Sequence, residues 1–289
     1  MTTHAAVPFR HGLLSISAAA VAWGVGGAVA ALLLRTSGLG PVAVCCWRFG
    51  VAALCLALLP AGAREAAGPR RATVLTGLGL AVSQCAYFGS VQYAGLGLGT
   101  LVTIGAGPVL TSLGAHLLLG ERLTARAAAA AVPALGGLAL LVAAPAAGPR
   151  PALGVALAVL AGAGQSGLTL WARGGGSARA TTGAFTTGLL CLLPTAFVEG
   201  GVLPAAGDPV LTAGALLFLG TVPTLLAYRW YFAGLAAVPG TTASVLVLLE
   251  PATAALIAVA LLGEPLTPAL AAGSALLLAA IAALAREGG

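Results

Sequence analysis

The chain has 289 residues, of which 7% are charged and 60% are hydrophobic before its 42 glycines are counted. A soluble domain carries about 25% charged residues, and a chain this apolar lacks the polar groups to cover a surface that faces water. The composition therefore excludes intrinsic disorder, a disulfide scaffold and a soluble nucleic-acid-binding domain. It predicts a protein that is embedded in a lipid bilayer.

Apolar stretches long enough to cross a bilayer follow one another from the N-terminus onwards. A spanning helix needs about 20 mostly apolar residues. The first stretch follows Arg10 and His11 and is too long for the core of a signal peptide. Glycine and proline residues mark the short connections, which leave no room for a soluble domain. The sequence thus predicts an all-α integral membrane protein with ten transmembrane helices, at residues 12–34, 41–60, 73–92, 99–119, 125–144, 151–172, 182–198, 210–232, 240–262 and 266–285.

The basic residues predict how these helices are oriented. All 13 are arginines, and the seven acidic residues leave a net charge of +6. With a cytoplasmic N-terminus, only Arg35 and Arg150 fall in outer loops, two arginines fall within spans, and the other nine lie in cytoplasmic segments. This asymmetry follows the positive-inside rule. We therefore expect a multi-pass protein of the cell (inner or plasma) membrane with both termini cytoplasmic, and the basic charge requires no nucleic-acid partner.

A repeat relates the two halves of the chain. Residues 107–124, GPVLTSLGAHLLLGERLT, match residues 250–267, EPATAALIAVALLGEPLT, when the chain is shifted by 143 residues. The shared proline and the shared Gly-Glu-x-Leu-Thr frame predict two five-helix halves, 1–144 and 145–289. Because five is odd, the second half has to be inverted relative to the first. Inverted repeats of this kind are typical of secondary transporters with a binding site at the bilayer midplane.

These motifs resemble the EamA-type group of the drug/metabolite transporter superfamily. The resemblance is carried by Glu250-Pro251 with LGEPLT at 262–267, by the weaker pair at 107–108 with LGERLT at 119–124, and by Ala22-Trp23-Gly24 and Trp47-Arg48-Phe49. It implies secondary transport through a central cavity that both halves line, often as export of amino acids and related metabolites. It also implies fifth and tenth helices that are peripheral or form a homodimer. Gly107 stands where the second half has Glu250, so only the second half has a carboxylate at this place of the repeat.

Two charged residues lie deep within the predicted spans. Glu250 is near the centre of span 240–262, where an ionised carboxylate costs about 2.5–3.5 kcal/mol, so it needs a partner, a water-filled cavity or a proton. Our hypothesis is that Glu250 couples transport to protons or binds a substrate amine. The alternative is a structural group that pairs with an arginine or caps backbone freed by Pro251. Arg48 could bind a substrate carboxylate, pair with Glu250 or simply bridge helices.

Polar and aromatic residues in the middle of the spans are further candidates for lining a cavity, since they offer stacking faces and hydrogen bonds to a semi-polar solute. Four such residues are Trp23, Gln84, Tyr87 and Gln165. The alternative for each is packing between helices. Trp23 and Gln165 fall near equivalent places in the two halves, which favours a shared inner position. Tyr228 has the same properties. Tyr231 could also line a cavity, but its place near a span end favours an interfacial anchor.

Glycine and proline residues interrupt two spans at equivalent places. Gly105, Gly107 and Pro108 lie in the fourth span, and Pro251 lies in the ninth. Proline removes a helix hydrogen bond and frees a carbonyl, so we predict helix breaks there that act as hinges or expose polar backbone to a substrate. Glu121 and Glu264, which stand beside glycines at span ends, are predicted to organise turns or gates.

No metal-binding, nucleophile or nucleotide-binding motif accompanies these residues. The five cysteines sit within apolar runs without the spacing of metal ligands. The sequence therefore predicts neither an enzyme nor a cofactor nor a metal, and a gradient of solute or protons is the remaining energy source. We expect an exporter of small metabolites, such as amino acids or related amphipathic compounds, that works by alternating access. The alternatives are a multidrug exporter of hydrophobic cations and a membrane scaffold or lipid-processing protein that transports no small solute.

Overall fold

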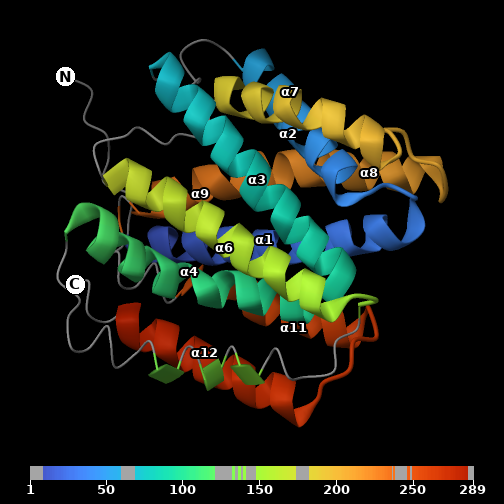
Figure 1. Ribbon diagram of the computed structural model, residues 1–289. Coiled ribbons are helices and arrows are strands. Elements are labelled where there is room, and N and C mark those ends of the chain that lie inside the picture. Colours follow the sequence, from blue (N-terminus) through green and yellow to red (C-terminus); the bar gives the residue numbers. More distant parts are fainter. Residues whose placement is uncertain are drawn as a thin grey trace.

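The fold is helical throughout the residues that the structure describes. The computed structural model describes residues 9–59, 69–120, 148–173, 182–235 and 249–285, with short pieces at 132–133, 136–137, 139–140, 237 and 246–247. Figure 1 shows the helices packed side by side. In chain order they are α1 (Phe9–Thr36), α2 (Pro41–Leu58), α3 (Arg70–Ala94), α4 (Leu96–Leu119), α6 (Pro151–Arg173), α7 (Thr182–Glu199), α8 (Pro209–Gly220), the π-helix η2 (Thr221–Leu226), α9 (Ala227–Leu235), α11 (Leu249–Ala260) and α12 (Pro268–Ala285).

Among the described residues, six helical stretches are long and apolar enough to cross a membrane. They are Phe9–Thr36, Pro41–Leu58, Arg70–Ala94, Leu96–Leu118, Pro151–Trp171 and Pro209–Tyr231. Two shorter apolar helices cover Gly183–Glu199 and Leu249–Ala260. Most of the predicted span 125–144 and the start of 240–262 lie outside the described residues, so the expected count of ten is not confirmed. The structure is that of an all-helical, multi-pass membrane protein.

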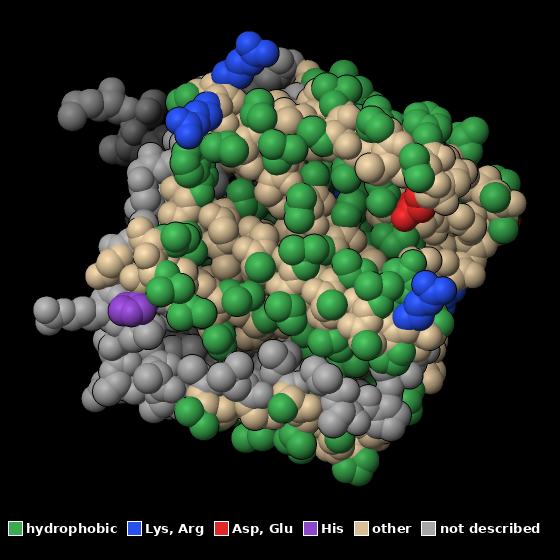
Figure 2. Space-filling view, viewed as in Figure 1, with side chains coloured by type: hydrophobic (Ala, Val, Ile, Leu, Met, Phe, Trp, Pro, Cys, Tyr) green, Lys and Arg blue, Asp and Glu red, His purple; other side chains and the backbone are tan. Residues whose placement is uncertain are grey.

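Many of the buried residues are small, and many large apolar residues face outward. Ala30 and Ala43 are fully buried, whereas the side chains of Val198 and Leu211 are 90% and 74% exposed. Figure 2 shows a face with many hydrophobic side chains, on which the few charged ones lie toward the upper and right edges. In lipid, helices associate through the close contact of small residues, and the outer leucines and valines contact acyl chains.

The contacts between helices α1–α4 and helices α6–α11 fall into matched sets. Both α3 and α4 pack on α6, just as both α9 and α11 pack on α1. Similarly, α3 packs on α7 as α8 packs on α2, while α2 contacts α7 and α4 contacts α11. Exchanging α1, α2, α3 and α4 for α6, α7, α8–α9 and α11 leaves this set unchanged.

A buried carboxylate holds the start of α4. Glu264, which is 6% exposed, accepts hydrogen bonds from the backbone N–H groups of Leu96 at 2.6 Å and Gly97 at 2.9 Å. Its carboxylate also lies 3.5 Å from the guanidinium of Arg35 at the end of α1. Free N–H groups and the helix dipole make a helix N-terminus a favourable place for a negative charge. The structure thus gives Glu264 a contact that the sequence did not predict, the cap of α4. Its expected role in a turn or gate stays a prediction, and Glu121 lies outside the described residues.

Two further acidic residues cap helices at their N-termini. Glu199, the last residue of α7, accepts hydrogen bonds from the backbone of Val42 at 3.0 Å and Ala43 at 3.1 Å in the first turn of α2. Asp208 caps its own helix, α8. Glu199 and Glu264 thus each connect one of the helices α1–α4 to a segment from the second part of the chain.

The helix break predicted in the fourth span is wrong. α4 runs without interruption from Leu96 to Leu119, through Gly105, Gly107 and Pro108. Membrane helices tolerate glycine and proline where neighbouring helices supply hydrogen bonds. The hydroxyl of Ser166 on α6 lies 2.9 Å from the Gly107 carbonyl and 2.8 Å from the Gly162 carbonyl of its own helix, so it is a bond donor beside this stretch. A role of this stretch as a hinge stays a prediction.

The irregular helix lies in the eighth predicted span. The six residues of η2, which include Pro223, form a π-helix between α8 and α9. Pro251, for which a break was also predicted, is buried in the first turn of α11, and the chain before it lies partly outside the described residues. The proline that distorts a described helix is therefore one that the repeat did not highlight.

Candidate solute-binding cavity

A cavity of about 420 Å³ lies between helices from both parts of the chain. Helices α1, α2, α3 and α4 line it together with α6, α8, η2, α9 and α11. All six residues that were predicted to bind a substrate or a coupling proton line it: Trp23, Arg48, Gln84, Tyr87, Gln165 and Glu250. Polar groups on apolar spans thus converge on one space, because contact with lipid is costly for them.

Arg48 supplies a fixed positive charge in this cavity. Its side chain is 8% exposed, its Nε donates to the Thr224 hydroxyl at 2.5 Å, and its Nη1 donates to the Gln84 side-chain oxygen. The guanidinium also lies 5.6 Å from the centre of the Phe88 ring, within the range of a cation–π interaction. These contacts use two of five N–H donors, so the guanidinium retains donors for an acidic group of a solute.

Glu250 presents a carboxylate to the same cavity. Among the described residues, no hydrogen bond or ion pair within 4 Å engages this carboxylate, and the pairing with Arg48 that was one of the alternatives is not formed. A carboxyl group in such a place is available to a proton or to a cationic group. Among the residues that the structure describes, the cavity therefore contains one tethered cation and one acid without a partner.

Aromatic side chains form one wall of the cavity around Trp23. The centre of its ring lies 5.4 Å from that of Tyr228 and 5.5 Å from that of Tyr231. Its indole Nε1 donates to the Pro223 carbonyl at 2.8 Å, which fixes the orientation of the ring. On the other side, the Tyr87 hydroxyl is 3.0 Å from that of Thr100. Tyr231, for which an interfacial anchor was the favoured interpretation, lines the cavity as well.

Sequence reasoning missed several polar residues of this site. Ser83, Thr103 and Thr169 line the cavity, and Thr224 holds Arg48. Hydroxyl residues are common in membrane helices, where they bond to their own backbone, so they stand out little in a sequence. The one available signal was the Pro223-Thr224 pair in the middle of an apolar span.

Glycines on α1 allow the helices around the cavity to approach closely. A Cβ atom on Gly24 would lie 2.7 Å from the Glu250 carbonyl and 2.7 Å from the Cβ of Thr253 on α11. A Cβ atom on Gly26 would lie 2.8 Å from the Pro223 ring. α1 thus contacts α11 and η2 through positions that accept no side chain, and this contact places Glu250 at the cavity.

We expect Gly24→Ala to destabilise the protein, whereas Gly50→Ala should not. The added methyl group at position 24 meets backbone, and overpacking of this kind costs about 1–3 kcal/mol. At Gly50, within α2, the nearest atom is a Leu189 methyl carbon at 3.7 Å, an ordinary contact. Alanine is the better helix former by about 0.5–1 kcal/mol. Thermal unfolding of both variants in detergent checks this, and equal midpoints would contradict the close packing of α1 on α11.

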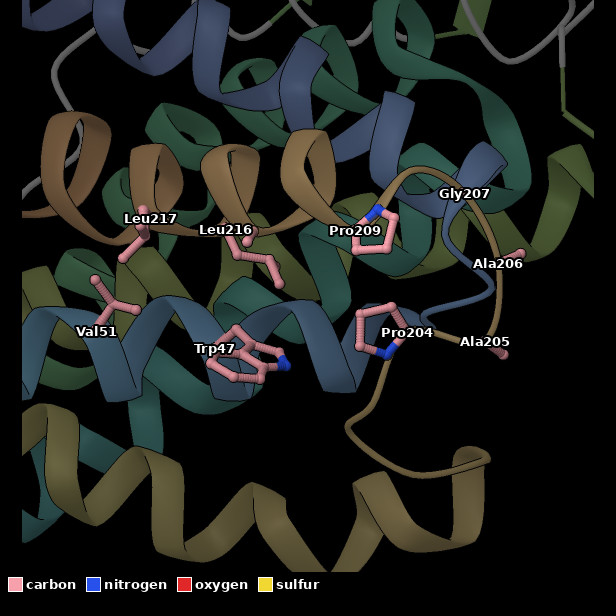
Figure 3. A pocket seen from close by; sticks show the side chains of 10 residues that line it. Trp47, Val51, Pro204, Ala205, Ala206, Gly207, Pro209, Leu216 and Leu217 are labelled. Carbon is pink, nitrogen blue, oxygen red and sulfur yellow. The ribbon is translucent and has the colours of Figure 1, made fainter.

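A second cavity, of about 600 Å³, lies between α2 and α8. Figure 3 shows Trp47 and Val51 of α2 across from Leu216 and Leu217 of α8, with the 204–209 segment at one end. None of its lining residues is charged. Although larger, this cavity offers no group that would orient a polar solute, and the cavity around Arg48 and Glu250 is the better candidate site.

The chain is similar to one known family and to proteins of two bacteria. The model of the EamA-like transporter family matches it over residues 10–143 and again over residues 152–286. The chain is 35% identical over 270 residues to the uncharacterized protein PA1977 of Pseudomonas aeruginosa, covering 91% of each chain. It is 28% identical over 202 residues to the uncharacterized transporter YwfM of Bacillus subtilis, covering 69% of this chain and 68% of that one. A crystal structure of a protein that is 21% identical covers 96% of this chain and 98% of its own with a TM-score of 0.61, and this likeness concerns the fold alone.

Proposed function

Since the chain belongs to the EamA-like transporter family, a family of drug/metabolite-type transporters, we propose that it is a secondary transporter that exports small metabolites. Amino acids and related amphipathic compounds are the proposed solutes. The observation that carries the proposal is the cavity in which the tethered Arg48 lies among aromatic side chains with Glu250, which has no partner among the described residues. A solute with an acidic group, an amine and an apolar part would find a partner for each.

Alternating access requires two parts that can rock around this cavity. We propose that the two parts are inverted five-helix repeats within a ten-helix protein. The two separate matches of the family model and the matched contacts of α1–α4 with α6–α11 support this. The excess of arginines on one side supports a plasma or inner membrane location with cytoplasmic termini.

The proposed energy source is a proton gradient that acts through Glu250. An acid without a partner in a spanning helix can alternate between its protonated and ionised forms as the cavity faces one side or the other. A proton moving inward would then drive a solute outward. This makes protons and a small solute the proposed partners, and a homodimer is compatible with the proposal.

Reconstitution tests the function directly. The purified protein would be placed in liposomes and screened for flux of labelled amino acids and cationic dyes, with and without a pH gradient, against protein-free liposomes. We expect gradient-dependent flux of at least one amino acid. The absence of flux of any solute would contradict transport and favour a membrane scaffold.

A second candidate function is the export of hydrophobic cations. The rings of Trp23, Tyr228 and Tyr231 line the same cavity as Glu250, and aromatic faces attract organic cations. Flux of the dyes without flux of any amino acid would favour this function over the first.

A further inference from the structure

The π-helix η2 has an identifiable cause in Pro223. Proline has no N–H group, so the Leu219 carbonyl lacks the donor that residue 223 would supply in an α-helix. The Thr224 hydroxyl takes over this bond and donates to the Leu219 carbonyl at 2.8 Å. Thr224 is 2% exposed and Leu219 is 1% exposed, so the hydroxyl replaces a bond that water cannot supply there. Such π-helical turns occur often at functional sites.

The same hydroxyl receives the cation of the cavity. A threonine hydroxyl has one hydrogen and two lone pairs. Its hydrogen is directed to the Leu219 carbonyl, and a lone pair accepts Arg48 Nε at 2.5 Å. The three groups therefore form one directed chain, from guanidinium to hydroxyl to carbonyl. A hydroxyl that accepts from a cation becomes the stronger donor, so each bond of the chain supports the other.

Helices α1 and α2 hold η2 at two further points. The indole of Trp23 on α1 donates to the Pro223 carbonyl at 2.8 Å. A Cβ atom on Gly220, just before η2, would overlap the Val51 side chain of α2 and lie 3.3 Å from the Arg48 carbonyl. Beyond η2, α9 carries Tyr228 and Tyr231 into the cavity. η2, which lies between α8 and the two tyrosines of α9, is thus attached to α1 and α2 by residues that line the site.

The geometry assigns to Thr224 the role of a positioning residue that couples Arg48 to the backbone of η2. While Arg48 donates to Thr224, the π-helical turn is held and Tyr228 and Tyr231 stay in place. Any group that draws Arg48 away from Thr224 loosens η2 and frees α9 to move. The meaning of this coupling for transport rests on the proposed function, because an acidic group of the solute is the natural competitor for the guanidinium.

Hydrogen exchange without any solute tests the coupling. The protein would be embedded in lipid nanodiscs, and exchange would be followed in residues 221–231. Loss of a hydrogen bond from a charged donor changes the equilibrium between the closed and open forms, and with it the exchange rate, by a factor of about ten or more. We expect Thr224→Val and Arg48→Gln each to speed exchange there by at least about tenfold, and the double variant to exceed neither single variant. Thr224→Ser, which keeps the hydroxyl, should stay within about twofold of the wild type.

A segment that touches neither η2 nor α2 provides the control for folding. α6 contacts α3 and α4, so exchange in residues 151–173 should be unchanged in every variant. The proposal is overturned if Arg48→Gln leaves residues 221–231 unchanged, or if the effects of the two single variants multiply in the double variant. Effects of two independent contacts multiply in this way, whereas the effects of breaking the same chain of hydrogen bonds at two points do not.

Pro223→Ala gives a second test that does not depend on the folding of Thr224→Val. Alanine restores the N–H group at position 223, which can bond to the Leu219 carbonyl and bypass the hydroxyl. Adding Arg48→Gln to this variant should then change exchange in residues 221–231 by less than about twofold. A tenfold change would overturn the assigned role. Because no flux is measured, failure of the transport assay would refute the proposed function and leave this coupling as it is.

Discussion

Replacing Glu250 by glutamine is expected to lower gradient-driven flux in proteoliposomes by at least about tenfold, the factor expected when a hydrogen bond to a charged group is lost. Glutamine keeps the size of the side chain and removes both the charge and the exchangeable proton. The remaining flux should no longer respond to pH, because the group whose protonation would depend on pH is gone. Initial rates measured with equal pH on both sides, and again with the solute-loaded lumen more alkaline than the medium, separate these two effects.

Asp208→Asn is the matched control for this prediction. It also exchanges a carboxylate for an amide, but at the exposed N-terminus of α8, away from the cavity. Its flux and pH response should equal those of the wild type. If Glu250→Gln transported with unchanged rate and unchanged pH response, Glu250 would have only a structural role.

Glu264→Ala is expected to lower the free energy of unfolding by about 2–3 kcal/mol. The change leaves the N–H groups of Leu96 and Gly97 without an acceptor in a buried place, and an unsatisfied buried donor costs about 1–3 kcal/mol. It also removes the favourable interaction with the dipole of α4. Denaturant titration in detergent micelles, followed by circular dichroism, measures the loss.

Two comparison variants locate the origin of this effect. Asp208→Ala also removes a cap with two N–H groups, but from an exposed helix end, and should cost about 0.5–1 kcal/mol. Arg35→Ala removes the half-exposed partner of Glu264 and should cost less than about 1 kcal/mol. A larger loss from Arg35→Ala than from Glu264→Ala would mean that the ion pair, rather than the cap, stabilises this end of α4.

Hydropathy alone predicted where most of the described helices lie, because the bilayer sets their length and excludes polar connections from it. The same physics predicted the cavity residues. Arg48, Gln84 and Glu250 are too polar for contact with lipid, so an inner cavity is where they can go. Six candidates named from single positions therefore meet in one space, although the sequence contains no measure of their distances.

What the sequence could not predict depends on contacts between distant segments. The LGEPLT motif indicated that Glu264 ends a helix, but its partner is the backbone of Leu96, 168 residues away. The break expected at Gly105–Pro108 is absent. An irregular turn that was not predicted occurs at Pro223 instead, because neighbouring helices decide whether a proline distorts a membrane helix. Tyr231, which follows η2 in the chain, lines the cavity, and its distance to the end of a span did not indicate this.

The carboxylate caps imply an uneven tolerance to mutation. Glu199 and Glu264 bind backbone N–H groups, which every amino acid except proline carries. The contact of Glu199 is therefore indifferent to which side chain occupies position 42, apart from proline. At position 97 a Cβ atom would lie 3.2 Å from the Glu264 carboxylate, so that site favours glycine. In a saturation mutagenesis experiment, positions 199 and 264 should be intolerant of substitution, while at position 42 proline alone should break the contact.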